Sequence, residues 1–118
     1  MRILILEDSS ERIKYFIDHF YDHELVITEK SNIAIDHLNV TVFDYIFLDN
    51  DLGNNNGSGI DVAVFLSSGL SINNDAMVII HSWNTPAVIE MVGYLPEARV
   101  LPYGTKDFNA FRIRNRGL

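Results

Sequence analysis

The sequence contains no cysteine. This absence excludes disulfide bonds and metal sites built from thiolates, and it agrees with the cytoplasmic location that we expect for the chain. The sequence also lacks any apolar run long enough to span a membrane. The opening stretch MRILILEDSS becomes acidic too soon for a signal peptide, so we expect no membrane partner.

Positive charge is scarce. Lysine and arginine together number 9 against 16 aspartates and glutamates, which gives a net charge of −7. This excess argues against duplex DNA as a partner, because like charges repel, but it permits a small phosphate ligand or an RNA end that binds together with a cation. Apolar residues make up 47% of the 118 residues, which indicates one folded domain over 1–118 rather than a disordered chain.

Short apolar segments alternate with amphipathic segments along the chain. Strands are predicted at 3–6, 25–28, 45–48, 77–80 and 99–101, and helices at 10–21, 31–38, 60–68, 85–93 and from 105 onward. This alternation predicts an α/β fold, a doubly wound parallel sheet with helices on both faces. With five strands we expect the flavodoxin-like order 2-1-3-4-5, in which the winding reverses between the first and third strands.

Carboxylates gather where those two strands are expected to end. Glu7 and Asp8 follow the first strand, and Asp49 and Asp51 follow the third. Ligands of such sheets bind beyond the carboxyl ends of the strands at this switch point. Like charges at short range cannot all remain ionised and unpaired, and carboxylate oxygens suit Mg²⁺ or Mn²⁺. We therefore expect all four acids to hold a divalent cation.

Simpler structural roles exist for some of these residues. Asp8 could cap the first helix with Glu11 at its third position, and Asp51 could form a turn. Arg12, one turn into the same helix, could bind a phosphate with its planar guanidinium or could pair with Asp8 or Glu11. The sequence does not separate these alternatives for Arg12.

A second polar cluster, HSWN, follows the fourth strand. His81 is suited to protonate a leaving oxygen near neutral pH. Ser82 and Asn84 could bind phosphate oxygens, although Asn84 could equally cap the next helix. Trp83 could stack on a base or could close the edge of the core.

These residues resemble a response-regulator receiver domain over most of the chain. Glu7-Asp8 is similar to the acidic pair after the first receiver strand. The segment FDYIFLDNDLG places Asp49 at the phosphoacceptor, and MVIIHS places Ser82 at the hydroxyl after the fourth strand. Receivers carry a lysine just before a proline at the end of the fifth strand, whereas this chain has Leu101 before Pro102.

The departures are similar to one offshoot, the cyclic-phosphate processing receiver domains. That group has an arginine after the first acidic segment, a D-x-D-L-G segment and an H-S-x-N segment. Arg12, the stretch 49–53 and the stretch 81–84 match these features. The group often has histidine between the two aspartates, where this chain has Asn50.

The resemblance implies a metal-dependent phosphoesterase that processes a cyclic nucleotide, a cyclic oligonucleotide or a 2′,3′-cyclic phosphate end. His81 and Asp49 would be catalytic, and Arg12, Ser82 and Asn84 would bind the phosphate. Asp49 could either hold the metal or attack the phosphorus directly. Two alternatives remain: a receiver that is phosphorylated on Asp49, and a module that sequesters a cyclic nucleotide without cleaving it.

Overall fold

The computed structural model describes residues 1–114, so the last part of the domain predicted over 1–118 lies outside the described residues. The strands are β1 (Arg2–Leu6), β2 (Glu24–Thr28), β3 (Tyr45–Leu48), β4 (Met77–Ile80) and β5 (Arg99–Val100). The helices are α1 (Ser10–His19), α2 (Ser31–Val40), α3 (Gly59–Ser67), α4 (Thr85–Tyr94) and α5 (Lys106–Ala110). Among residues 1–114, no helix combines the length and the apolar content needed to cross a membrane.

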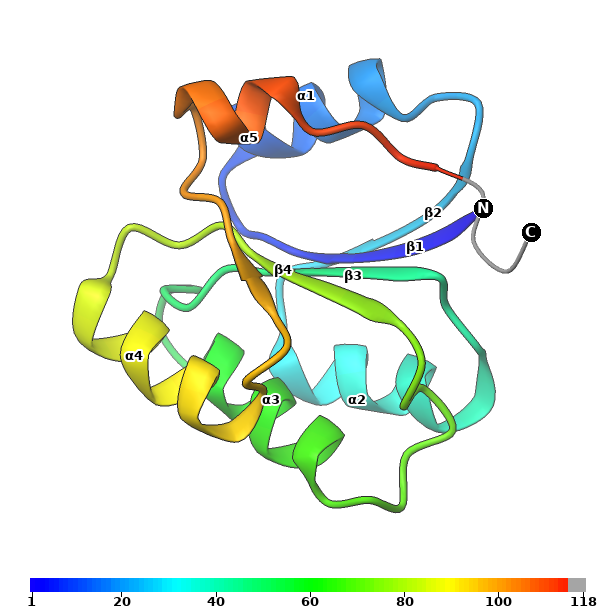
Figure 1. Cartoon of the computed structure of the whole chain (residues 1–118), viewed down its shortest axis with the longest axis vertical. Helices are drawn as coiled ribbons and strands as arrows, with labels where there is room; N and C mark the ends of the chain where they lie inside the picture. Colours follow the sequence, from blue (N-terminus) through cyan, green and yellow to red (C-terminus); the bar gives the residue numbers. More distant parts are fainter. Residues whose placement is uncertain (115–118) are drawn as a thin grey trace.

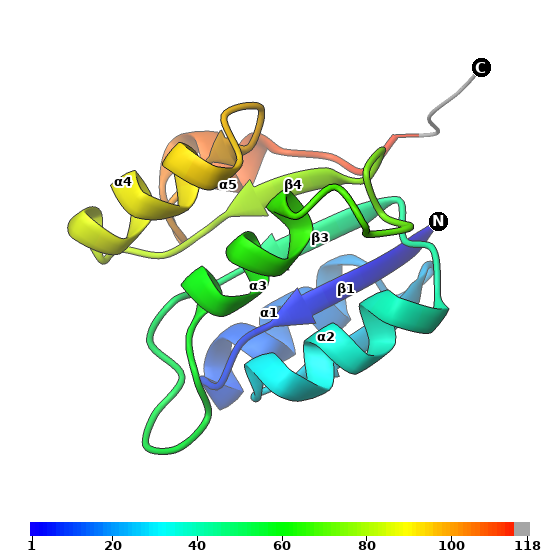
Figure 2. The ribbon, with the colours of Figure 1, turned by 90° about the horizontal axis from the view of Figure 1, so that it is seen from below.

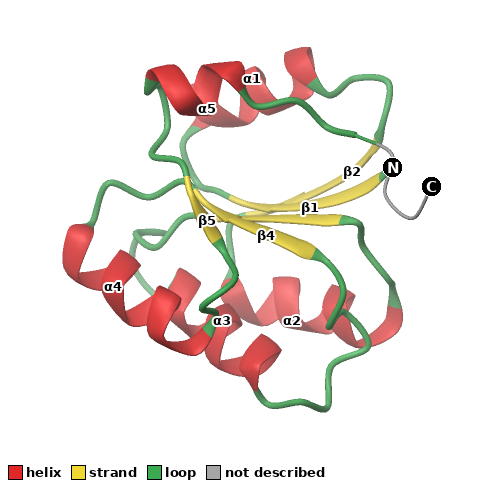
Figure 3. Cartoon of the chain, viewed as in Figure 1, coloured by secondary structure: helices red, strands yellow, loops and turns green. Residues whose placement is uncertain are grey.

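All five strands form one parallel sheet in the order β2-β1-β3-β4-β5. This confirms the predicted α/β fold and strand order. Helices α1 and α5 cover one face of the sheet, and α2, α3 and α4 cover the other (Figures 1 and 3). Figure 2 shows α4, α3 and α2 next to one another in front of the strands. The winding therefore reverses between β1 and β3, where a ligand site is expected.

The two faces of the sheet bury separate apolar cores. Ile3 and Ile5 point toward α1 and α5, and the intervening Leu4 and Leu6 point toward the other three helices. A parallel strand covered on both sides needs apolar residues at every position, which explains why these segments read as continuous apolar runs. The alternation also fixes the face on which the residue after each strand emerges.

Because of the strand register, β1, β3 and β4 end side by side at the same edge of the sheet. Leu6 is paired with Leu48, and Leu48 is paired with Ile80. Because these are the last residues of β1, β3 and β4, the polar residue that follows each strand leaves the sheet at the same height and on the same face. The candidate site is therefore a product of strand register.

The helix starts differ in part from the sequence-based expectation. Ser9 caps α1, because its Oγ accepts a hydrogen bond from the backbone N–H of Arg12 at 3.4 Å. The alternative that Asp8 caps this helix is therefore wrong. Asn84 caps α4 through an Oδ1 that accepts from the backbone N–H of Ala87 at 3.2 Å, as one of the two alternatives expected.

Two glycines determine the path from β3 to α3. A Cβ atom on Gly59 would lie 2.0 Å from the backbone oxygen of Asp49, so only glycine allows α3 to start against the end of the strand. Gly57 has φ 75, and a Cβ there would lie 1.9 Å from Oγ of Ser31. The loop after β3 is thus held close to the sheet edge that carries the acids.

Candidate functional site

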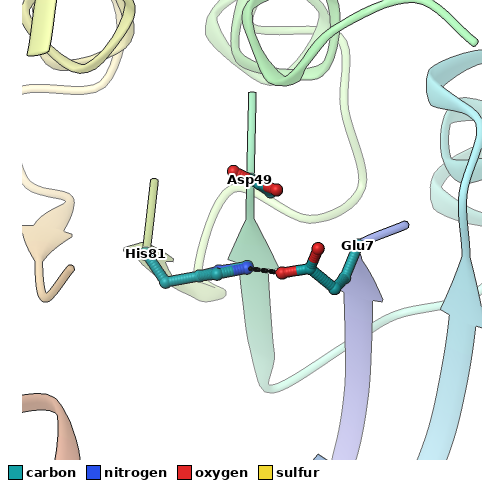
Figure 4. A group of neighbouring side chains, drawn as sticks. All are labelled: Glu7, Asp49 and His81. Carbon is teal, nitrogen blue, oxygen red and sulfur yellow. Dashed lines mark hydrogen bonds and ion pairs between the residues drawn. The ribbon is translucent and has the colours of Figure 1, made fainter. Parts of the chain in front are cut away.

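Glu7 and His81 form a fully buried pair at the ends of β1 and β4. Nε2 of His81 lies 2.8 Å from Oε1 of Glu7, and neither side chain has exposed surface. Figure 4 shows the two side chains reaching toward each other from either side of Asp49. The second oxygen, Oε2 of Glu7, accepts from the backbone N–H groups of Asp8 and Ser9, each at 3.0 Å. Binding a cation through Glu7 would therefore mean giving up one of these bonds.

The imidazole of His81 sits beneath the acids rather than at the surface. Its ring lies among Phe16, Phe47 and Phe108, with centroid distances of 5.3, 6.3 and 6.4 Å. Nδ1 is buried and has no hydrogen-bond partner among the described residues. The position beside the acids agrees with the sequence-based expectation, but any proton transfer must proceed through Nε2 and the neighbouring carboxylates.

The charge of Glu7 is favoured by its partners. Burial by itself would raise the pKa of Glu7, but the hydrogen bond and the charge of His81 outweigh it. The Ser9 N–H and the Arg12 guanidinium act in the same direction, and the pKa of Glu7 is lowered below its ordinary value. Glu7 is thus an ionised acceptor that holds the imidazole in place.

Asp49 lies between the members of this pair and is itself buried, with 6% of its surface exposed. Its Oδ1 accepts from the backbone N–H of Asn50 at 2.8 Å. Burial and then the charge of Glu7 raise the pKa of Asp49 from 3.8 to about 6. Possible ligand atoms of Glu7, Asp49 and His81 all lie within 4.8 Å of one another, so these three residues have the spacing of a metal site.

Arg12 points from α1 into the site. Its Nη1 lies 3.8 Å from Oε1 of Glu7 and 4.0 Å from Oδ2 of Asp49. Its guanidinium lies 4.8 Å from the centroid of the Tyr103 ring. The long ion-pair distances and the partial exposure of Arg12 leave N–H donors for an incoming anion. Arg12 therefore pairs with the strand-end acids rather than with its neighbours in the sequence.

Asp8 and Asp51 lie outside the buried group of three, at its more exposed rim. Oδ2 of Asp8 lies 3.6 Å from the Cβ position of Gly53, so this carboxylate reaches the loop after β3. Burial and then the charge of Glu7 raise the pKa of Asp8. Oδ1 of Asp51 accepts from Nδ2 of Asn50 at 3.2 Å and from Nδ2 of Asn84 at 3.1 Å.

Ser82 and Asn84 shape the loop after β4. Ser82 is buried, and its Oγ accepts from the backbone N–H of Asn84 at 3.0 Å. The Asn84 side chain both caps α4 and bridges to Asp51, so it joins the ends of β3 and β4. Phosphate binding by these two residues stays a prediction.

Among residues 1–114, the structure brings together one group with metal-ligand spacing, Glu7, Asp49 and His81, while Asp8 and Asp51 of the expected set lie outside it. Carboxylate oxygens are the ligands that Mg²⁺ and Mn²⁺ prefer. Asp8, Asp49 and Asp51 are the acids whose oxygens are not all engaged, whereas both Glu7 oxygens are bonded within the protein. Burial and then the negative charge of Glu7 raise the pKa values of Asp8 and Asp49, and a bound cation would offset the second effect.

The position that carries lysine in an ordinary receiver is here part of the core. Leu101 follows β5, is 4% exposed and packs in the cluster under α1 and α5. The cation paired with Asp49 is Arg12, from a different element. Sequence reasoning did not identify Tyr103, which supports Arg12, because it lies in a loop and belongs to no recognised motif.

Comparison with known proteins gives a family and a fold. Residues 2–97 match the model of the family described as "Cyclic-phosphate processing Receiver domain". No curated protein matched the chain. The solved structures similar to it include a response regulator from Burkholderia pseudomallei with a phosphorylated aspartic acid, a calcium ion and citrate (TM-score 0.73, 15% identity, 92% of this chain and 62% of that one). The chain thus spans less than two thirds of that protein.

Two further structures show the same architecture. They are the phosphorylated cyanobacterial phytochrome response regulator RcpA (TM-score 0.71, 17% identity, 92% and 83% covered) and a CheY-like receiver domain from Methanospirillum hungatei (TM-score 0.72, 12% identity, 92% and 85% covered). At these identities the similarity establishes the fold, and the family match over residues 2–97 establishes the family. The chain belongs to the cyclic-phosphate processing receiver domain family.

Proposed function

We propose that this domain is a metal-dependent phosphoesterase that opens a cyclic phosphate in a cyclic nucleotide, a cyclic oligonucleotide or a 2′,3′-cyclic phosphate end. One observation carries the proposal: a buried Glu7–His81 pair lies beside Asp49, while the lysine position of a signalling receiver holds Leu101. Such a site keeps the acids of a receiver and adds an imidazole. An imidazole serves proton transfer to a leaving oxygen rather than stable storage of a phosphoryl group.

The rim acids and Arg12 would bind the phosphate end of the substrate. Asp8, Asp49 and Asp51 would hold Mg²⁺ or Mn²⁺, which when bound supplies charge neutralisation and an activated water. Arg12 presents guanidinium N–H donors at 4.0 Å from Asp49, where they can bind non-bridging phosphate oxygens. Ser82 and Asn84 lie on the adjacent loop, and their hydrogen-bonding groups complete the proposed phosphate site.

His81 would supply the proton for the leaving oxygen from behind the carboxylates. Ligand atoms of His81 and Asp49 lie within 4.8 Å of each other, so an imidazolium at His81 would pass one proton through the Asp49 carboxyl group to the alkoxide and would be left as a neutral imidazole. Glu7 fixes the ring orientation by accepting at 2.8 Å. In this scheme Glu7 is a positioning residue.

A substrate panel tests the function. Purified protein is incubated with 3′,5′-cyclic mononucleotides, cyclic dinucleotides and 2′,3′-cyclic mononucleotides, with Mg²⁺ or Mn²⁺ and separately with EDTA, and products are separated by chromatography. We expect one class to be opened to a monoester, with loss in EDTA and in Asp49→Asn. Binding without any product would support the sequestering module instead, and neither binding nor product would refute both.

A second candidate function follows from the place of Asp49. It stands at the end of β3, in a fold shared with a response regulator that carries a phosphorylated aspartic acid. A phosphorylated receiver would take phosphate from acetyl phosphate and would lose this ability in Asp49→Asn. The buried Leu101 weighs against it, because no lysine side chain from that position can reach a phosphoryl group.

A further inference from the structure

Trp83, the chain's single tryptophan, lies in the loop between β4 and α4. It is 60% exposed, so it does not close the edge of the core. Its indole is nevertheless fixed, because Nε1–H donates to the backbone oxygen of Tyr103 at 2.8 Å. The hydrogen bond fixes one edge of the indole, but most of the ring stays in water and contributes little hydrophobic stabilisation. Its exposed surface remains available to a ligand.

Tyr103 is a firm support for this indole. Its backbone N–H donates to the oxygen of His81 at 2.9 Å, so two hydrogen bonds join the loop after β5 to the loop after β4. The Tyr103 ring packs against Phe108 and Tyr15, with centroid distances of 5.1 and 5.4 Å. The position of Trp83 is therefore set by the same framework that positions His81.

A line of contacts connects the indole to the buried acids. The guanidinium of Arg12 lies 4.8 Å from the Tyr103 ring centroid, and its Nη1 lies 4.0 Å from Oδ2 of Asp49. From the carboxylate the contacts run through the guanidinium to the Tyr103 ring, and the exposed indole is bonded to the backbone oxygen of the same residue. A nucleotide has the same order of chemistry, with a charged phosphate at one end and a flat aromatic base at the other.

We propose that Trp83 is the base-stacking residue of the site, so that the substrate is a nucleoside cyclic phosphate rather than a base-free cyclic phosphodiester. This inference rests on the proposed phosphoesterase function for the phosphate end. Stacking suits a protein with a net charge of −7, because a neutral base adds affinity that bulk electrostatics do not supply. Every base has a π-face, so the platform tolerates different bases.

Trp83 is also the reporter for the first test, because its emission is the only tryptophan signal of the chain. Wild-type protein with Mg²⁺ is mixed rapidly with adenosine 3′,5′-cyclic monophosphate or with 1,3-propanediol cyclic phosphate, which has the cyclic diester without a base. We expect saturable quenching by the nucleotide alone. Equal quenching by both compounds, or none by the nucleotide, would overturn the stacking site.

Steady-state kinetics on both compounds supply the second test. Trp83→Ala is expected to raise KM for the nucleotide by about tenfold to a hundredfold, with a far smaller change for the base-free diester. Trp83→Phe should retain most of the affinity, because it keeps an aromatic face. Tyr21→Ala removes another exposed aromatic, 80% exposed and located before β2, and should change neither KM.

The outcomes separate the two proposals. Hydrolysis of both compounds with the same KM ratio in wild type and Trp83→Ala would overturn the stacking site and leave the phosphoesterase function intact. If neither compound nor any other cyclic phosphate is hydrolysed, the proposed function fails, and the quenching titration then decides the stacking site independently.

Discussion

His81 and Glu7 are 74 residues apart in the sequence, yet Nε2 of the first lies 2.8 Å from Oε1 of the second in a place with no exposed surface. The bond spans the end of β3 and connects β1 to β4 directly above the apolar core. It keeps an imidazole and a carboxylate together beside Asp49. The structural and the chemical consequences of this contact can be tested separately.

The first prediction concerns the stability that the pair contributes. His81→Ala would leave the buried Glu7 carboxylate without its imidazole partner, which is expected to lower the free energy of unfolding by about 3–5 kcal/mol. Glu7→Gln combined with His81→Ala should cost less than the two single changes summed, because they share one interaction. Denaturant unfolding measures the two single variants and the double variant. His37→Ala, in the last turn of α2, serves as the control, and its free energy of unfolding should change by no more than about 0.5 kcal/mol. Strict additivity would contradict the pairing.

The second prediction concerns Asp49 and pH in EDTA. The folded pKa of Asp49 is about 6, against an ordinary 3.8, so the native state binds this proton more tightly than the unfolded state. Stability is therefore lost as pH rises from 3.8 through about 6. Asp49→Asn removes this loss, and it should raise the free energy of unfolding by up to about 3 kcal/mol at pH 7.5 but much less at pH 4. Thermal unfolding of the wild type and of Asp49→Asn at both pH values measures this difference, and Asp36→Asn, on the exposed side of α2, is the control. An equal stabilisation by Asp49→Asn at both pH values would contradict the raised pKa of Asp49.

The third prediction concerns cation binding at the rim. Mn²⁺ or Mg²⁺ should raise the unfolding temperature of the wild type, with a stabilisation of about 2.7 kcal/mol when the free cation is about 100 times Kd. Asp8→Asn and Asp51→Asn should each reduce this gain, because each removes a carboxylate with an available oxygen. Asp36→Asn should not. A gain unchanged in both rim variants would place the cation elsewhere.

The fourth prediction concerns two glycines. Gly59→Ala forces a Cβ to within 2.0 Å of the backbone oxygen of Asp49, so α3 or the end of β3 must shift. We expect a loss of about 3 kcal/mol, the upper end of the range for overpacked sites, together with weaker cation binding. Gly93, the second-last residue of α4, faces open space, and Gly93→Ala should stabilise by up to about 0.5–1 kcal/mol. Denaturant unfolding of both variants provides the comparison, and a neutral Gly59→Ala would show that Asp49 does not depend on this contact.

The sequence predicted the sheet well because the relevant signals are local. Continuous apolar runs mark strands buried on both faces, and their ends locate Asp49 and the acids after β1. The regular alternation of strands and helices predicted a doubly wound sheet, and the order 2-1-3-4-5 was expected because it is the flavodoxin-like arrangement of five such strands. Leu101 was identified as a departure from receivers, and the structure shows why it is tolerated: it packs in the core.

The details of the site depended on information that a sequence does not display. Whether His81 faces solvent or Glu7 is decided by strand register and by side-chain orientation at sites distant in the chain. Ser9, not Asp8, caps α1, because the helix starts at Ser10, a boundary that two adjacent capping residues leave open in the sequence. Tyr103 lacks any motif, and its importance comes from contacts with Arg12 and Trp83.

The central claim is that this acidic site opens cyclic phosphates instead of storing a phosphoryl group on Asp49. The most direct measurement is ³¹P NMR of the protein with Mg²⁺, first with the cyclic nucleotides of the panel and then with acetyl phosphate. The account predicts that a cyclic diester resonance is replaced by a monoester resonance, that EDTA stops this, and that acetyl phosphate leaves no aspartyl phosphate. Unchanged cyclic diesters together with a phosphorylated Asp49 would contradict it.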